Sequence, residues 1–114
     1  MKTHRMHLDP APFEMIRSGE KRFELRLYDE KRRAIRPGDR IEFTNNAGGE
    51  TLVMKVHALH VFGDFGALYA ALPLEACGYK TEALAAASPR DMENYYSKED
   101  IRRSGVVAIE LKRP

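Results

Sequence analysis

The run from Gly19 to Arg26, GEKRFELR, constrains the fold of this chain more than any other segment. It follows a predicted short helix and opens a strand, in which successive side chains point to opposite faces. One face is apolar, and we expect it to enter a core: Phe23, Leu25 and Leu27. The other face is polar: Arg22, Glu24, Arg26 and Tyr28. Lys21 lies directly before this strand. Together with the charged row, it indicates an anion or nucleotide site.

The rest of the chain predicts a mixed α+β fold. The other strands are expected at residues 4–8, 40–45, 51–62 and 105–112. Asp9 and Pro10 start a first helix that Gly19 ends, and further short helices are expected at residues 64–72, 81–87, 88–96 and 98–103, with another helical turn at 73–77. Ser88 and Pro89 are the start signal of the helix at 88–96. The charged segment up to Arg36 is expected to be a loop, followed by a turn at residues 37–39. The strand at 51–62 is long and apolar on both faces at its end, which favours a bent strand of a small barrel partly covered by helices.

The spacing Gly19-x-Lys21-x-x-Glu24-x-Arg26 resembles the signature GxKxxExR of the ASCH domain family, which is similar in fold to PUA domains. The turn at residues 37–39 and the closing strand follow in the order that such domains show. The resemblance covers nearly the whole chain. It implies one ASCH domain over residues 1–114, with the fold of a small mixed PUA-like β-barrel and inserted short helices.

Composition limits the classes of protein to which the chain can belong. A length of 114 residues supports one domain with a modest core. Cys77 is the only cysteine, which excludes an internal disulfide and favours a reducing compartment, and we expect it to be a buried structural residue. The N-terminus is charged and no apolar run is long enough to span a membrane. These features predict a cytoplasmic protein with no membrane partner, and they leave its oligomeric state open.

Basic residues gather in one part of the chain. The net charge is only +2, yet residues 17–40 hold nine Lys or Arg residues against five acids. Such a segment favours a phosphate-bearing partner. We expect Arg32 or Arg33 to hold phosphate, although a solvated charged face would also explain this cluster.

The leading functional hypothesis is binding of RNA or a nucleotide in a basic cleft on the signature strand. Its predicted ligand-binding residues are Lys21, Glu24, Arg26, Tyr28, Arg32, Arg33 and Tyr96. The tyrosines are the residues on which bases would stack. Tyr95 and Tyr96 would face different ways on a helix, and we assign Tyr96 to the cleft.

The resemblance also implies an alternative function, because some small ASCH proteins are hydrolases. Some of them deacetylate N4-acetylcytidine with the signature lysine, a hydroxyl residue at the position of Glu24 and a glutamate in the helical insert. Other ASCH proteins resemble ribonucleases that cut single-stranded RNA. In this chain Lys21 and Glu24 would be catalytic, with Glu24 a base that activates water. Glu75 is a candidate for the helical glutamate. A protein-interaction module is a third hypothesis.

No metal or cofactor is expected. The pairs His4-x-x-His7 and His57-x-x-His60 lie on predicted strands, where a spacing of three puts the rings on opposite faces. Ser97 is interpreted as a helix cap rather than as a hydroxyl group of the site.

Overall fold

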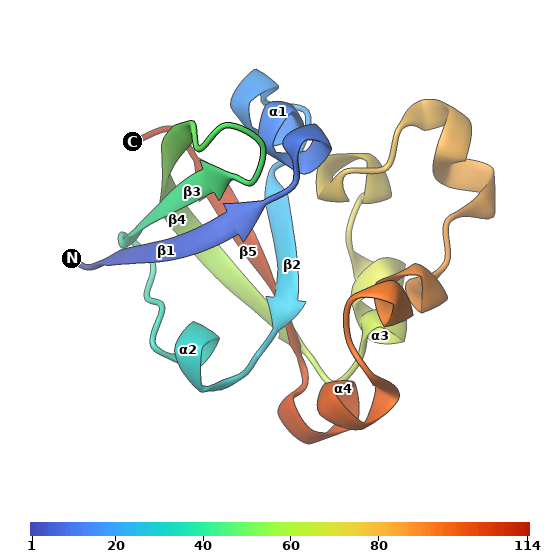
Figure 1. The fold of residues 1–114 in the computed structure, drawn as a ribbon. Helices are drawn as coiled ribbons and strands as arrows, with labels where there is room; N and C mark the ends of the chain where they lie inside the picture. The colour runs from blue at the N-terminus through green and yellow to red at the C-terminus, as the bar shows by residue number, and fades with distance from the viewer.

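The computed structural model describes residues 1–114 as a curled five-stranded sheet with short helices around it (Figure 1). The strands are β1 (Thr3–Leu8), β2 (Phe23–Leu27), β3 (Arg40–Asn45), β4 (Thr51–Phe62) and β5 (Val106–Lys112). The α-helices are α1 (Pro10–Ser18), α2 (Glu30–Arg33), α3 (Phe65–Ala71) and α4 (Lys98–Ser104). Three 3-10 helices complete the chain: η1 (Leu74–Cys77), η2 (Thr81–Ala86) and η3 (Pro89–Asn94). The predicted strands are confirmed to within one residue at each end, and no helix is long and apolar enough to cross a bilayer.

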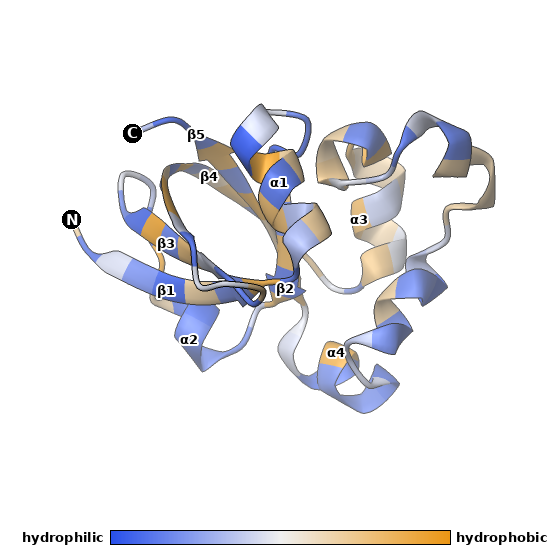
Figure 2. Ribbon diagram, turned by 45° about the horizontal axis from the view of Figure 1, so that its top comes forward, coloured by the Kyte–Doolittle hydropathy of each residue, from blue (hydrophilic) through white to orange (hydrophobic).

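The sheet has the order β1-β3-β4-β5-β2 and curls into a half-barrel (Figure 2). β1 pairs with β3 in parallel, and the other neighbours are antiparallel. β1 and β2 are therefore the two edges of the sheet, with no ladder between them. A side chain joins these edges instead, because Arg26 Nη2 donates to the carbonyl oxygen of His7 at 3.0 Å. The predicted α+β, barrel-like PUA-type fold is confirmed.

The sheet separates two apolar cores. The first lies inside the curl and includes Phe13 and Ile16 from α1, whose apolar spacing is that of one helical face. The second lies between β2, β5 and the segment 64–104, which we call the helical insert, and it includes Phe23, Leu25, Phe65 and Leu68. Phe23 and Leu25 are therefore core residues, as the alternation on the signature strand predicts.

β4 does not keep one alternation of side chains along its whole length. The register against β5 shifts between Val56 and Ala58. Val56 belongs to the inner core and Leu59, rather than Ala58, packs against that core beyond the shift. The extra residue, His57, forms a β-bulge that turns the following side chains to the other face and bends the strand.

The segment before β3 is the main departure from the predicted elements. Residues 30–33 form the short helix α2 instead of a loop, because the Asp29 side chain accepts a hydrogen bond from Arg32 N at 3.1 Å and caps the helix. In the insert, the helical segments predicted at residues 73–77, 81–87 and 88–96 are the 3-10 helices η1, η2 and η3, each with somewhat narrower bounds. Ser88 and Asp91 form a capping box at the start of η3, as its Ser-Pro start signal indicates.

Candidate functional site

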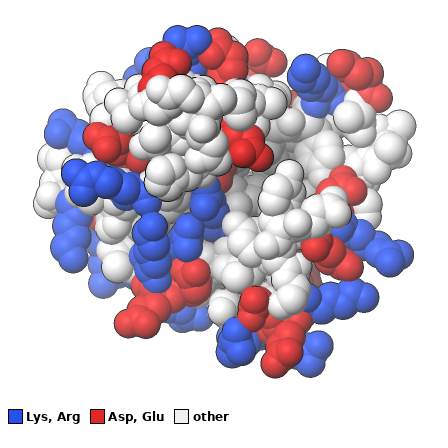
Figure 3. Space-filling model, in the orientation of Figure 1, with Lys and Arg blue, Asp and Glu red and all other residues white.

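A cleft of about 640 Å³ lies between the barrel and the helical insert. Side chains of α1 and β2 form one wall, and side chains of residues 69–96 form the other. The space-filling view shows the surface hollowed between these two parts (Figure 3). Its volume lies within the usual range for small-molecule sites, about 300–1,000 Å³.

A three-membered ion cluster forms the floor of this cleft. Lys21 Nζ lies 2.9 Å from Glu24 Oε1, and Arg26 Nε donates to Glu24 Oε2 at 2.6 Å. The side chain of Glu24 is only 5% exposed, against 12% for Lys21 and 15% for Arg26. The Glu24–Arg26 ion pair is therefore buried, unlike the exposed pairs of a protein surface.

Local structure explains why Lys21 points into the cleft. α1 ends at Gly19 in the left-handed conformation (φ 91°), and Lys21 N then donates to the carbonyl oxygen of Met15 at 2.9 Å. On the other side, Gly78 leaves room for the lysine stem, since a Cβ atom there would lie 3.2 Å from Lys21 Cδ. The amine is held between the end of α1 and the end of η1.

Two opposing effects set the charge of Glu24. Burial raises the pKa of its carboxyl group, but the positive charges of Lys21 and then Arg26 outweigh burial and bring the pKa below its ordinary value. Glu24 is thus an anion at neutral pH. Its Oε1 is buried and lies 2.9 Å from Lys21 Nζ. The carboxylate therefore holds the two cationic side chains in place on the floor of the cleft.

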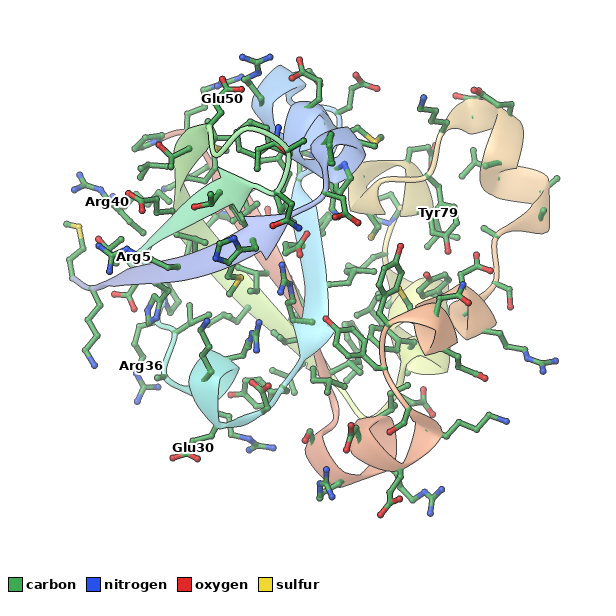
Figure 4. The ribbon with its side chains drawn as sticks, in the orientation of Figure 1. Arg5, Glu30, Arg36, Arg40, Glu50 and Tyr79 are labelled. Carbon is green, nitrogen blue, oxygen red and sulfur yellow. The ribbon has the colours of Figure 1, made fainter.

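Aromatic side chains of the insert form the opposite wall. Tyr96 stacks on Phe65 with ring centroids 6.1 Å apart and also lines the cleft, as predicted. Tyr95 lines the cleft too and is 71% exposed, so the pair does not divide into one core and one cleft residue. Tyr69 and Tyr79 complete this wall, and Figure 4 shows Tyr79 on the insert side.

The cleft offers no activated hydroxyl or thiol. No serine or threonine lines it. Cys77 does, but burial raises the pKa of its thiol to about 11 despite the nearby charges of Lys21 and Arg22. The buried thiol is protonated at neutral pH, as expected for a structural cysteine. It packs in the second core, between the sheet and the helical insert, which we call the outer core.

Three predicted ligand-binding residues do not line the cleft: Tyr28, Arg32 and Arg33. Arg33 lies over the Tyr28 ring at 4.5 Å and donates to the carbonyl oxygens of Tyr28 and Ser104. Arg32 is paired with Asp29 at 3.1 Å, and its buried Nε has no partner. These arginines anchor α2 against the fold, which explains their positions without a ligand.

The cleft is not basic by formal charge. Its lining has three cationic side chains, Lys21, Arg26 and Lys80, against four carboxylates. The carboxylates belong to Asp9, Glu24, Glu82 and Asp91. Exposed arginines are found elsewhere, and Arg5, Arg36 and Arg40 lie on the opposite side of the molecule from Tyr79 (Figure 4). A phosphate chain is thus not attracted into the cleft by charge alone.

The remaining candidates lie apart from the cleft or have structural partners. Glu75 is exposed and does not line the cleft. Ser97 caps α4 by accepting from Asp100 N at 3.1 Å. His4 binds Asp39 at 2.9 Å and His60 binds Glu110 at 2.8 Å. No group of three or more His, Cys, Asp or Glu side chains is arranged to hold a metal ion.

Sequence reasoning missed one feature of the insert wall. Tyr69 OH lies 2.7 Å from Tyr79 OH, and Tyr79 OH donates to Asp91 Oδ2 at 2.6 Å. These residues are 10 and 12 positions apart along the chain and belong to no periodic pattern. The one available signal was the concentration of tyrosines in the insert, since four of the five tyrosines lie between residues 69 and 96.

Comparisons with known proteins agree with this architecture. The model of the ASCH domain family matches residues 6–114. The hypothetical protein PH0355 is 36% identical, with 98% of each chain covered and a TM-score of 0.79. The protein PF0455 from Pyrococcus furiosus is 32% identical, with 96% of each chain covered and a TM-score of 0.68.

A more distant structure shares the fold alone. The ASCH protein from Zymomonas mobilis is 18% identical, with a TM-score of 0.61, and the match covers 96% of this chain and 66% of that one. No curated protein matches significantly.

Proposed function

This chain belongs to the ASCH domain family, and on that premise we propose that it binds the base of an RNA nucleotide or of a free nucleotide in the cleft between barrel and insert. The observation that carries the proposal is the buried Lys21–Glu24–Arg26 cluster on the floor of a cleft walled by tyrosines. Lys21 and Arg26 offer donors, and the buried carboxylate of Glu24 holds both side chains in place. A nucleobase edge carries carbonyl and ring-nitrogen acceptors for such donors, and its faces stack on aromatic rings.

The charges of the cleft as a whole do not favour a phosphate chain inside it. The lining has more carboxylates than cations, so its formal charge gives phosphates no net attraction into the cleft. Phosphates of a nucleotide would remain outside the cleft. Arg32 and Arg33 are still candidates to meet them, at the cost of their present contacts with Asp29 and Ser104.

Calorimetric titration tests this proposal. The four common ribonucleosides, their 5′-monophosphates and a ten-nucleotide single-stranded RNA are titrated into the protein and into two variants, Lys21→Met and Tyr95→Ala. Because Tyr95 is mostly exposed, its replacement leaves the fold intact while it removes a stacking surface, and we expect about tenfold weaker binding. Lys21→Met should lose binding as well, whereas the control Lys112→Met, exposed and outside the cleft, should not.

The salt dependence of RNA binding shows which result would contradict the proposal. Binding of a neutral nucleoside in the cleft changes little between about 50 and 200 mM salt, whereas binding through many phosphates weakens steeply. RNA binding that is steeply salt-dependent and unaffected by Lys21→Met and Tyr95→Ala would locate the interaction on the basic surface near Arg36 and Arg40, and the proposal would be wrong.

Hydrolysis of a modified nucleoside is the second candidate, favoured by the amine of Lys21 held 2.9 Å from a carboxylate in a small-molecule cleft. Two observations weigh against it. The lowered pKa makes Glu24 a weak base, and no serine or threonine lines the cleft as a nucleophile. Incubation with N4-acetylcytidine, followed by chromatography for cytidine, decides the matter. Release of cytidine that Glu24→Gln abolishes would favour the enzyme over the binding protein.

A further inference from the structure

The chain of hydroxyl groups on the insert wall is separate from the Lys21–Glu24–Arg26 cluster and has no part in holding it. Tyr69 comes from α3, Tyr79 from the link between η1 and η2, and Asp91 from η3. Their polar atoms are joined at 2.7 and 2.6 Å, and all three residues line the cleft. Three separate segments thus bring one polar chain to the wall that faces the cluster.

The direction of these hydrogen bonds follows from counting protons. Asp91 Oδ2 accepts from Tyr79 OH and from Ser88 N, and both contacts lower the pKa of the carboxyl group, so Asp91 is an anion. Tyr79 has one proton, which it donates to Asp91. Tyr69 must then donate to the Tyr79 oxygen. Both phenol protons are used within the wall, which therefore presents acceptors to the cleft, including Asp91 Oδ1, which has no protein partner.

Burial sets the orientation of a ligand between the two walls. Glu24 on the floor is buried, whereas Asp91 is only partly buried and lies among the more exposed residues of η3. A ligand that fits must carry acceptors for Lys21 and Arg26 at its buried end and donors for Asp91 at its outer end. A ribonucleoside has this polarity, because its base bears carbonyl and ring-nitrogen acceptors and its ribose bears two adjacent hydroxyl groups.

We propose that Asp91, held by Tyr79, binds the free 2′- and 3′-hydroxyls of a ribonucleoside whose base occupies the cleft. The inference rests on the proposed function and sharpens it. Because Oδ2 already accepts from Tyr79 OH and Ser88 N, the two hydroxyls bind to Oδ1, whose two lone pairs can accept from both of these adjacent donors. A phosphodiester at the 3′ position would remove one donor and bring an anion against Asp91. The ligand is therefore a nucleoside with a free diol, either as a free molecule or as the 3′-terminal residue of an RNA.

Paired ligands that differ in one hydroxyl test this inference. The ribonucleoside that binds best in the calorimetric panel is compared with its 2′-deoxy, 3′-deoxy and 3′-phosphate forms. We expect each change to weaken binding to the wild-type protein about tenfold or more, the loss typical of a hydrogen bond to a charged group. In Asp91→Asn the ribonucleoside should bind about as weakly as its deoxy forms. Glu93→Gln is the matched control, because Glu93 lies on the same element outside the cleft.

Each outcome has one meaning. Equal binding of ribo and deoxy forms to the wild type refutes the diol contact and leaves base binding standing. If Asp91→Asn weakens ribo and deoxy forms alike, Asp91 contacts the base, and the inference is wrong. If no nucleoside of either kind binds, the proposed function fails together with the inference. Thermal melting of Asp91→Asn monitors the fold, and Tyr79→Phe, which keeps the ring but frees Asp91, should lower the preference for ribose on its own.

Two RNA ligands separate the sources of the diol. An RNA with a free 3′ end and the same RNA with a 3′-phosphate are titrated beside the free nucleoside. Binding that needs the free end supports recognition of an RNA terminus, and binding of the nucleoside alone supports a free small molecule. Equal binding of both RNAs in the cleft would overturn the inference, because an internal nucleotide has no free diol.

Discussion

Replacement of Glu24 by glutamine tests the central element of the site. The substitution keeps the shape of the side chain but removes the charge that Lys21 and Arg26 share. All three side chains are at least 85% buried, so solvent screens the cations poorly. Removal of one partner from a buried ion pair costs about 3–5 kcal/mol. We expect Glu24→Gln to lose about 3 kcal/mol of unfolding free energy, a large part of the roughly 5–15 kcal/mol typical of a domain.

The pH dependence gives this prediction a sign. The folded pKa of Glu24 is lowered, so its charge stabilises the fold above the ordinary glutamate pKa of about 4.3 and the contribution is lost as pH falls through the lower folded pKa. The difference between wild type and Glu24→Gln should be constant above about pH 5 and shrink in acid, where the wild-type carboxyl group is also neutral.

Urea denaturation followed by circular dichroism measures both effects. The double variant Lys21→Met/Glu24→Gln should lose less than the sum of its single variants, because it no longer buries the lysine charge. Glu14→Gln, which removes an exposed partner of Arg17, should leave stability unchanged within error. A loss below about 1 kcal/mol for Glu24→Gln, the value of exposed pairs, would refute the reasoning. So would a difference that does not change with pH.

Three further changes have defined outcomes. Asp39→Asn should destabilise the protein at pH 7 and less so in acid, because hydrogen bonds, first that with His4, lower the pKa of the buried Asp39. Melting curves from pH 7 to 3 measure this difference, and a difference that grows in acid would contradict the prediction. Cys77 should react with iodoacetamide at pH 8 about a hundredfold more slowly than an ordinary thiol, since its pKa rises from 9.0 to about 11, and a normal rate by mass spectrometry would show an open outer core. Gly78→Ala should lower the free energy of unfolding by about 1–2 kcal/mol, because Gly78 has φ 109°, and it should weaken nucleoside binding, because the new methyl group would press on Lys21. The control Gly63→Ala should change neither the urea denaturation curve nor the calorimetric binding curve.

Local patterns in the sequence determined much of the fold. Alternation on the strand before Tyr28 correctly separated Phe23 and Leu25 from Glu24 and Arg26, because a strand reverses its side chains at every residue. Caps and turns were readable for the same reason, since a helix start such as that at Ser97 depends on side chains within three residues. The helix α2 was not predicted, because its capping residue Asp29 lies in a segment that was interpreted as a charged loop.

The tertiary structure alone decided how deeply the site is buried and what faces it. Glu24 is a buried anion on the floor of a cleft that the insert, far along the chain, completes, and no periodicity within the strand carries that information. The chain from Tyr69 to Asp91 likewise joins three segments that only packing brings together. The alternation of a strand is set by bonds between neighbouring residues, whereas burial, ion pairing and the polarity of a cleft are set by contacts between residues distant in sequence.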